Sequence, residues 1–251
     1  MIETLKHSNP FYFYTGLGFI GLGIITLILI FFDSTQVSGI NRWIKPTKFA
    51  FSIGLYIITL IYVFDLLPVH WITQIAGSII IITMVGEIIC TVLQASRAVA
   101  SHFNTSTPFD AKVFSIMGVL IFINTFILII LMLIIIARPE IDLTTKVAFV
   151  AALGSILIAS YFGVKMVSIN HHHLYPEMSG RSVPFLGWNI KAGDLRIPHF
   201  IGLHGLQIIP LVAFVMQQKQ YQHRLSMLIL FIVLYYAFIF LSIPIARRIG
   251  I

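Results

Sequence analysis

The sequence predicts an all-α integral membrane protein, a bundle of seven transmembrane helices. Of its 251 residues, 58% are hydrophobic and 10% are charged, and the mean hydropathy is +0.97. Soluble domains carry roughly a quarter charged residues, so this chain lacks the polar side chains that cover a water-facing surface. Several apolar stretches also exceed the roughly 18 residues that distinguish a membrane span from a buried helix.

The apolar stretches predict seven spans in one domain, residues 1–251. The first stretch is too long for the apolar segment of a signal peptide, so we interpret it as a span. The expected spans are residues 11–32, 48–67, 71–95, 112–137, 146–168, 197–217 and 224–246. An odd number of spans places the two termini on opposite sides of the membrane.

The basic residues predict the orientation. Eleven of the sixteen Lys and Arg follow the first, third, fifth or seventh span: Arg42, Lys45, Lys48, Arg97, Lys112, Lys165, Arg181, Lys191, Arg196, Arg247 and Arg248. Because cytoplasmic loops are rich in Lys and Arg, we expect the N-terminus outside and the C-terminus in the cytoplasm. The net charge of +7 lies in short loops between spans, so we expect a lipid bilayer and not nucleic acid as the partner. The single cysteine, Cys90, excludes an internal disulfide.

The third span carries a polar stripe. At about 100° per residue, six side chains point within roughly 40° of one direction, and they are Thr83, Glu87, Cys90, Gln94, Arg97 and Ser101. Such a stripe cannot face lipid. Glu87 lies roughly 15 Å from Arg97 along the helix axis, inside the hydrocarbon, where an ionisable group is a candidate functional residue. The alternative is a structural glutamate that is protonated or hydrogen-bonded to a neighbouring helix.

Two connections beside this stripe are rich in polar residues. The segment SHFNTSTPFD begins at Ser101. In it, Thr107 or Asp110 suits a cap of the fourth span. A cap does not explain His102 and Asn104. The segment NRWIKPTKFAFS contains Trp43, Lys45 and Lys48, which suit an interfacial belt, with Pro46 at a break before the second span. Alternatively, Lys48, Ser52 and Thr59 share one helix face and line a cavity.

The sixth span follows the segment GDLRIPHFIGLHGLQ, residues 193–207. Arg196, His199, His204 and Gln207 share an arc of roughly 140°. The two histidines are five residues apart and lie at the edges of that arc, so they are not the i, i+4 pair of a helical metal clamp. Asp194 suits an N-cap and Arg196 an interfacial charge, or both belong to a site. The preceding triplet, residues 171–173, is either an interfacial histidine cluster or supplies one histidine to a site.

Three other patterns indicate packing. Gly16, Gly18 and Gly21 spell GxGxxG inside one apolar helix, which favours close packing of helices over nucleotide binding. Asn124 suits an inter-helix hydrogen bond, and Pro210 is expected to kink the sixth span. The connection between the fifth and sixth expected spans, residues 169–196, is nearly thirty residues long and, with Phe185 and Trp188, is expected to lie ordered on the protein or the bilayer surface.

Under the seven-span count these segments meet at the cytoplasmic face. The resulting hypothesis is a pocket floored by Glu87 and His204, with the third and sixth spans as partners. Glu87 and His102 are the candidate catalytic residues, and His102, His199 and His204 are the candidate metal ligands. The candidate cofactor-binding residues are His199, His204, Arg97, Arg196, Lys48, Gln94, Gln207 and Asp194.

The pocket is compatible with three functions. The first is a redox or cofactor protein that binds haem or a transition metal through two of these histidines and one histidine of the triplet, with Arg97 and Arg196 at propionates. The second is a membrane-embedded enzyme that acts on a lipid or prenyl phosphate headgroup. The third is a small proton-coupled transporter or sensor that uses Glu87 and His204. The spacing HxxxxH of His199 and His204 argues against the zinc hydrolases and di-iron desaturases of membranes, which need HxxxH pairs.

Three blocks carry a resemblance to a known family. WIKPTKF, SHFNTSTPFD and GDLRIPHFIGLHGLQ resemble blocks in a family of uncharacterised bacterial multi-pass membrane proteins, and the resemblance covers most of the chain. It implies a location in the bacterial inner membrane. It implies no activity and no cofactor.

Overall fold

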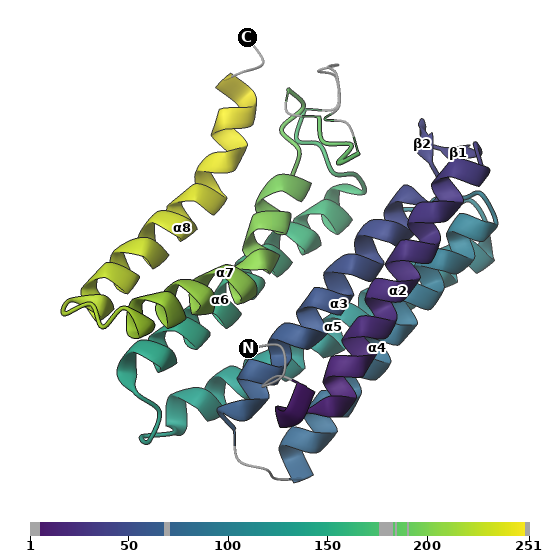
Figure 1. Ribbon diagram of the computed structural model, residues 1–251. Helices are drawn as coiled ribbons and strands as arrows, with labels where there is room; N and C mark the ends of the chain where they lie inside the picture. The colour runs from purple at the N-terminus through teal and green to yellow at the C-terminus, as the bar shows by residue number, and fades with distance from the viewer. Residues whose placement is uncertain (1–5, 68–70, 176–182, 184, 190, 249–251) are drawn as a thin grey trace. The chain divides into compact units, whose positions relative to one another are not determined.

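The protein is all-α, with seven long helices. The computed structural model describes residues 6–67, 71–175, 183, 185–189 and 191–248, with side chains up to Ile243 in the last helix. The helices are α2 (Pro10–Phe32), α3 (Ile44–Asp65), α4 (Trp71–Ser96), α5 (Pro108–Ala137), α6 (Leu143–Ile169), α7 (Arg196–Gln218) and α8 (Arg224–Arg248) (Figure 1). Two-residue strands β1 (Gln36–Val37) and β2 (Ile40–Asn41) pair antiparallel. All seven helices are long and apolar enough to cross a membrane, which confirms the predicted fold class.

Three helices begin earlier than the apolar stretches predict, because polar or cyclic residues form their first turns. Helix α3 starts at Ile44, so the interpretation of Pro46 as a break before the span is wrong. Proline is tolerated in a first turn, where its missing N–H has no partner to lose. Helix α5 starts at Pro108 behind Thr107, and α6 starts at Leu143 because the Asp142 side chain caps it.

The helices form two compact units, residues 1–131 and residues 132–251. The first contains α2, α3, α4 and most of α5, and the second contains the end of α5 with α6, α7 and α8 (Figure 1). Each unit has its own apolar core and is described separately. The single domain expected for residues 1–251 and the pairing of the third and sixth spans remain predictions.

Small residues allow close helix packing in both units. A Cβ atom on Gly54 of α3 would lie 2.8 Å from the Gly16 carbonyl oxygen of α2, and a Cβ on Gly202 of α7 would lie 2.9 Å from the Ser155 carbonyl oxygen of α6. The packing role predicted for Gly16 is therefore confirmed. A Cβ atom on Gly18 or Gly21 would meet no atom within 4 Å, so two of the three glycines of the GxGxxG pattern do not pack against another helix.

Hydroxyl groups supply several of the hydrogen bonds between helices. The Tyr56 hydroxyl donates to Asn124 Oδ1 over 3.2 Å, which confirms the inter-helix bond predicted for Asn124. In the second unit, Ser155 Oγ donates to the Gly202 carbonyl over 2.9 Å, and Tyr236 donates to the Ala151 carbonyl over 2.5 Å. Such bonds fix the register of helices for which the bilayer supplies no hydrophobic driving force.

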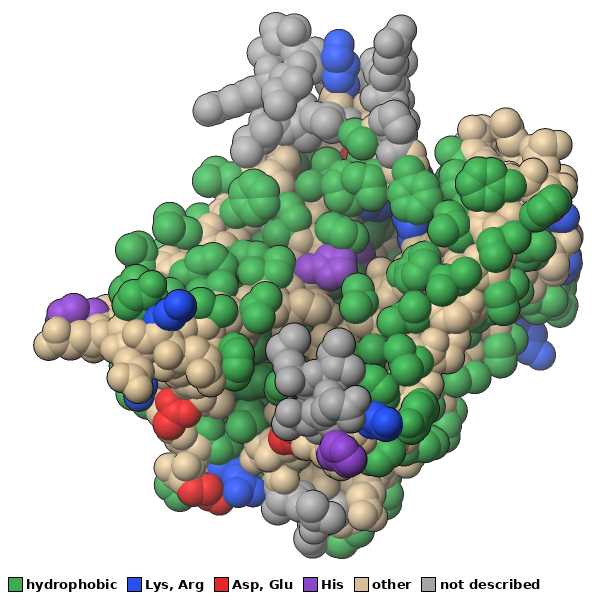
Figure 2. Space-filling model, in the orientation of Figure 1, with side chains coloured by type: hydrophobic (Ala, Val, Ile, Leu, Met, Phe, Trp, Pro, Cys, Tyr) green, Lys and Arg blue, Asp and Glu red, His purple; other side chains and the backbone are tan. Residues whose placement is uncertain are grey.

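The outer surface of the helices is apolar. Large hydrophobic side chains such as Phe32 and Phe122 are strongly exposed, and hydrophobic side chains cover most of the face in Figure 2. By contrast, Thr83, Glu87 and Gln94 are buried, as predicted for a stripe that turns away from lipid. The chain is a multi-pass membrane protein.

Some residues of the sequence predictions lie outside the described part of the chain. These are Arg181 and, for their side chains, Arg247 and Arg248. The orientation therefore remains a prediction from the loop charges. Helix α7 continues through Pro210 to Gln218.

Candidate functional sites at the polar end of each unit

In the first unit, the two polar connections meet at one end. Arg42 Nη1 donates to the Ser96 carbonyl over 3.0 Å, and Lys45 Nζ lies 3.0 Å from His102 Nδ1. The segments NRWIKPTKFAFS and SHFNTSTPFD are therefore neighbours, which confirms that part of the predicted convergence.

Asp33 fixes the first of these connections. Its carboxylate accepts hydrogen bonds from Thr35 N at 3.0 Å, Trp43 Nε1 at 2.7 Å and Arg42 Nε at 2.6 Å. These bonds, those from Thr35 first, hold the pKa of Asp33 well below its usual range. The turn between β1 and β2 uses Ser38 and Gly39, both with positive φ, so local hydrogen bonds account for the whole connection.

Asp110 fixes the second connection. Its carboxylate, 2% exposed, accepts from Gln94 Nε2 at 2.9 Å, Arg97 Nη1 at 2.5 Å and Thr107 Oγ1 at 2.7 Å. The Asp110 N–H donates to Thr107 Oγ1 over 3.1 Å, a reciprocal cap of α5. The predicted cap is confirmed. Gln94 and Arg97, both predicted to bind a cofactor, here join the end of α4 to the start of α5.

Asn104 has a structural role that sequence reasoning missed. Its side chain accepts from Ser106 N over 3.1 Å and donates to the Ala100 carbonyl over 3.0 Å. Ala98 and Phe103, which both precede Asn104, have positive φ, and the Asn104 amide closes the turn that reverses the chain between the helices.

Glu87 is the buried carboxyl of this unit. It is 5% exposed on α4, and among the described residues its Oε1 atom has no hydrogen-bond partner. The Lys45 ammonium lies within electrostatic range of the carboxylate. A charge in the hydrocarbon region is costly unless it is paired, so Lys45 is the partner that permits a charged Glu87.

Lys45 also determines the tautomer of His102. An ammonium group can only donate, so His102 Nδ1 accepts and the neutral ring carries its proton on Nε2. The ring lies among Phe49, Phe103 and Phe114, whose centroids are 5.7, 6.3 and 6.0 Å away. The sequence analysis placed Lys48 in the site. In the structure, the lysine that contacts His102 is Lys45, and Lys48 lies half-buried further along α3.

In the second unit, the loop after α6 pairs with the segment before α7. Helix α6 ends at Ile169, and its C-cap, Asn170, has the left-handed conformation common after helix ends. His173 and Asp194 form an antiparallel bridge, and Leu195 N donates to the His172 carbonyl over 2.9 Å. Trp188 packs on Phe200 of α7 at 5.3 Å, as expected for a loop that lies back on the protein.

Asp194 is the centre of this loop. It is 1% exposed, and Arg196 donates to Oδ1 from its backbone N at 3.0 Å and from Nε at 2.8 Å. Arg196 Nη2 and Asn189 N donate to Oδ2 at 2.5 and 3.0 Å. The cap residue itself is Leu195, so Asp194 stabilises the start of α7 from one position earlier. A phosphate or propionate group would have to compete with Asp194 for Arg196.

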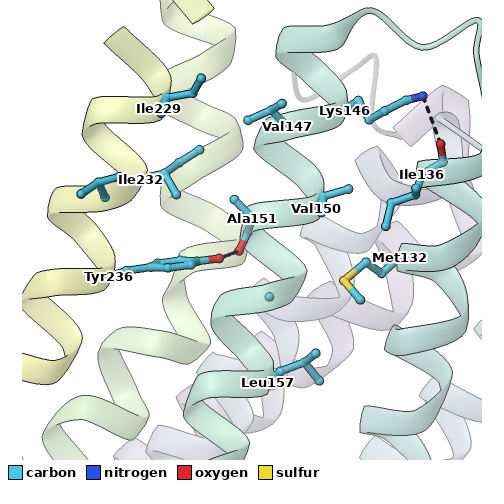
Figure 3. A pocket seen from close by; sticks show the side chains of 12 residues that line it. Met132, Ile136, Lys146, Val147, Val150, Ala151, Leu157, Ile229, Ile232 and Tyr236 are labelled. Carbon is cyan, nitrogen blue, oxygen red and sulfur yellow. Dashed lines mark hydrogen bonds between the residues drawn. The ribbon is translucent and has the colours of Figure 1, made fainter. Parts of the chain in front are cut away.

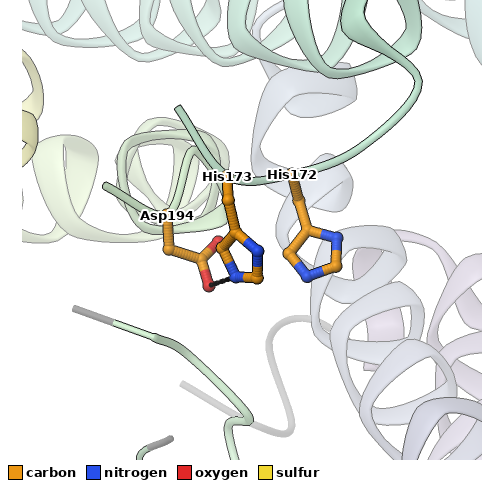
Figure 4. Close-up of side chains that lie close together, drawn as sticks. All are labelled: His172, His173 and Asp194. Atoms are coloured by element: carbon orange, nitrogen blue, oxygen red, sulfur yellow. Dashed lines mark ion pairs between the residues drawn. The ribbon is translucent and has the colours of Figure 1, made fainter. Parts of the chain in front are cut away.

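His172, His173 and Asp194 form a group with metal-ligand character (Figure 4). One ligand atom from each lies within 4.8 Å of the others, and no second such group occurs within the described ranges. His173 Nε2 is 3.6 Å from Asp194 Oδ2, and the two imidazole centroids are 4.2 Å apart. Burial lowers the pKa of His173 below its ordinary value of 6.5, although the Asp194 carboxylate opposes that shift.

The two histidines of α7 have different surroundings. His199 Nδ1 donates to the Ala159 carbonyl of α6 over 2.8 Å, which leaves Nε2 of the neutral ring as an acceptor. The ring lies beside Gly163 of α6, where an added Cβ would make an ordinary van der Waals contact of 3.4 Å with His199 Cε1. His204 packs against Phe200 with ring centroids 4.2 Å apart, and Gln207 Oε1 is buried without a partner among the described residues.

An apolar groove also lies in the second unit. Its volume is about 630 Å³, and α5, α6 and α8 line it with side chains that include Met132, Val150 and Ile232 (Figure 3). Lys146 at its edge donates to the Ile136 carbonyl over 3.2 Å. None of the residues predicted for the site lines this groove.

Comparison with known proteins does not add a family or a function. No protein family, curated protein or solved structure matches the chain. Functional inference therefore rests on the two polar ends.

Proposed function

We propose that this multi-pass membrane protein is proton-linked, a small transporter or sensor in which Glu87 binds the proton or a cation that replaces it. The observation that carries the proposal is the buried Glu87 carboxyl, with one oxygen unpartnered among the described residues. Intramembrane carboxyls of this kind mark proton and ion pathways.

The neighbours of Glu87 separate it from the structural carboxyls of the same unit. Asp33 and Asp110 each pair with an arginine and receive two further hydrogen bonds or more. Among the described residues, Glu87 Oε1 has no hydrogen-bond partner, and the cation that favours the charged carboxylate is Lys45. The charge on Glu87 therefore depends on Lys45, and protonation of Glu87 would remove the electrostatic attraction between the two side chains.

Lys45 connects Glu87 to the polar end of the unit. When Glu87 is charged, Lys45 is shared between that carboxylate and His102 Nδ1. A proton on Glu87 weakens the first interaction, and a proton on His102 abolishes the second, because Nδ1 then donates instead of accepting. We infer that the three groups exchange protons as a unit, with His102 at its outer end.

Cofactor binding is a second candidate, favoured by His199. Histidines that ligate a metal commonly donate their other ring N–H to a backbone carbonyl, and His199 does so to Ala159. Haem or a transition metal at Nε2 would give a visible spectrum or bound metal in the purified protein, and His199→Ala would remove it. Arg97 and Arg196 give less support to a phosphate or propionate site, because Asp110 and Asp194 already pair with them.

Proton flux into liposomes tests the first proposal. The wild-type protein, reconstituted with an internal pH-sensitive dye, is expected to respond to an imposed pH gradient, and Glu87→Gln is expected to abolish that response. Infrared difference spectra taken as the pH is lowered provide a second readout, since the carboxyl band assigned to Glu87 should disappear in the same variant. This measurement also detects a sensor that moves no protons.

Glu140→Gln is the matched control. Glu140 is exposed and pairs with Arg138 in the connection between α5 and α6, so its loss should leave both readouts unchanged. Wild-type flux and an unchanged infrared band in Glu87→Gln would overturn the proposal. Melting curves of both variants show whether each is folded.

We also propose a bacterial inner-membrane location with the N-terminus outside. The resemblance of the three sequence blocks and the excess of Lys and Arg after odd-numbered spans support it. A fluorescent protein fused to the C-terminus should then be fluorescent in bacterial cells, and a periplasmic reporter fused there should be inactive.

A further inference from the structure

We propose that His172, His173 and Asp194 bind a divalent transition-metal ion of the Zn²⁺ class at the polar end of the second unit. The proposal extends beyond the proton-linked function and does not depend on it. Glu87 belongs to the first unit, and each site can fail without the other.

The donor set suits such an ion. Two imidazole nitrogens and one carboxylate oxygen are common ligands of Zn²⁺, Co²⁺ and Ni²⁺, and Mg²⁺ or Ca²⁺ would favour oxygen alone. Ligand atoms of a tetrahedral zinc site lie about 3.3 Å apart, from metal–ligand distances of about 2.0–2.1 Å. The three atoms here lie within 4.8 Å of one another, so side-chain rotation alone closes the site.

The backbone holds the three ligands in place. His173 faces Asp194 across an antiparallel bridge, and Leu174 N donates to the Gly193 carbonyl over 3.1 Å on the next rung. The Leu195 N–H bond to the His172 carbonyl anchors the other histidine. Ligands mounted on paired backbone lose little conformational entropy on binding.

The charges of the loop are compatible with a bound cation. Arg196 makes two bonds to Asp194 Oδ1, while His173 faces Oδ2. A metal ion at Oδ2 would displace the Arg196 Nη2 bond to that oxygen. The Asn189 N–H bond to Oδ2 and the two Arg196 bonds to Oδ1 would remain as an outer shell that orients the carboxylate.

Three protein ligands leave one position of a tetrahedral ion open. His171 does not belong to the group, although its Nδ1 atom is buried and has no partner among the described residues. Because the described residues supply no fourth ligand to the group, a water molecule or an external small molecule can take that position. The site can accept a metal ion for structural purposes, or present it to a ligand.

Direct metal binding tests the proposal. Protein without a polyhistidine tag is stripped with a chelator in detergent and titrated with Zn²⁺ against a competing indicator. One ion per chain is expected. His172→Ala and His173→Ala should each weaken binding by more than the roughly 10- to 100-fold that loss of an outer-shell partner costs, and the exposed His223→Ala should bind as wild type does.

Co²⁺ provides a readout that needs no variant. A tetrahedral site of nitrogen and oxygen ligands should give the visible d–d absorption of four-coordinate Co²⁺ in wild-type protein, and Zn²⁺ should displace it. A wild-type protein without that absorption, or His172 and His173 variants that bind Zn²⁺ as tightly as His223→Ala, would overturn the proposal. Loss of binding with proton flux intact would leave the function of Glu87 untouched.

Discussion

The polar ends of the two units use the same arrangement to fix a loop. In the first unit, the buried Asp110 carboxylate pairs with Arg97, and in the second the buried Asp194 carboxylate pairs with Arg196. Each carboxylate also bonds groups at the start of a helix, Thr107 before α5 and the backbone of Arg196 at α7. In both places, an aspartate replaces the solvation that the helix N-terminus would otherwise require.

The two ends differ in what lies beside that aspartate. In the first unit, an incompletely satisfied carboxyl, Glu87, is buried on α4 within electrostatic range of Lys45. In the second, His172 and His173 lie beside Asp194 itself. The comparison therefore distinguishes two kinds of carboxyl group. Asp110 and Asp194 are stabilised as carboxylates by an arginine and further hydrogen-bond donors, whereas Glu87 Oε1 has no hydrogen-bond partner among the described residues and Glu87 is proposed to gain and lose a proton.

The largest effect should come from Asp194→Ala. The variant leaves the Arg196 guanidinium and the Asn189 N–H without their acceptor, and breaking a part-buried pair of this kind costs about 3 kcal/mol. Unfolding in detergent by SDS or heat measures this loss.

Glu87→Gln should change the same free energy by less than about 1 kcal/mol, because it removes a charge that few groups stabilise. A Glu87→Gln variant less stable than Asp194→Ala would reverse the assignment of structural and functional carboxyls. Asp65→Ala, an exposed carboxyl bonded to Ser8, should be neutral.

An intermediate effect is expected at the glycines of the two helix crossings. Gly54→Ala and Gly202→Ala each place a methyl group within 3 Å of a neighbouring backbone carbonyl, and such overpacking costs about 2 kcal/mol. Gly18→Ala meets open space, so its melting temperature should be unchanged or higher. Equal losses at Gly54 and Gly202 would show that the cores are alike and that only the polar ends differ.

The smallest effect concerns Asp33 and depends on pH. Because hydrogen bonds lower the pKa of Asp33 in the folded protein, its stabilising contribution is present above the unfolded value of 3.8 and is lost as the pH falls below it. Asp33→Asn should therefore melt below wild type at neutral pH, and the difference should shrink in acid. A difference that stays constant with pH would mean that Asp33 acts through shape and not through charge.

The helices could be predicted from the sequence, and their first turns could not. Apolar length is a property of consecutive residues, so seven stretches predicted seven helices. The starts of α3 and α5 depend on Trp43, Pro46 and Thr107, which are polar or cyclic and fall outside an apolar window. The buried stripe around Glu87 followed from helical periodicity alone.

The partners of the site residues were less predictable, because they depend on how loops turn. Arg97 and Asp110 are thirteen positions apart, and they meet because Ala98 and Phe103 adopt positive φ. No periodic pattern encodes that turn. His173 meets Asp194 through a backbone bridge across a long loop, whereas the triplet alone suggested an interfacial cluster.

The tryptophans give each polar end its own optical signal. Trp43 donates its indole N–H to Asp33 in the first unit, and Trp188 packs on Phe200 in the second. The third, Trp71, begins α4 and is 62% exposed. Replacing Trp71 together with either Trp188 or Trp43 by phenylalanine leaves one tryptophan, at the first or the second polar end, and its fluorescence would report whether that end responds to acid or to a metal ion.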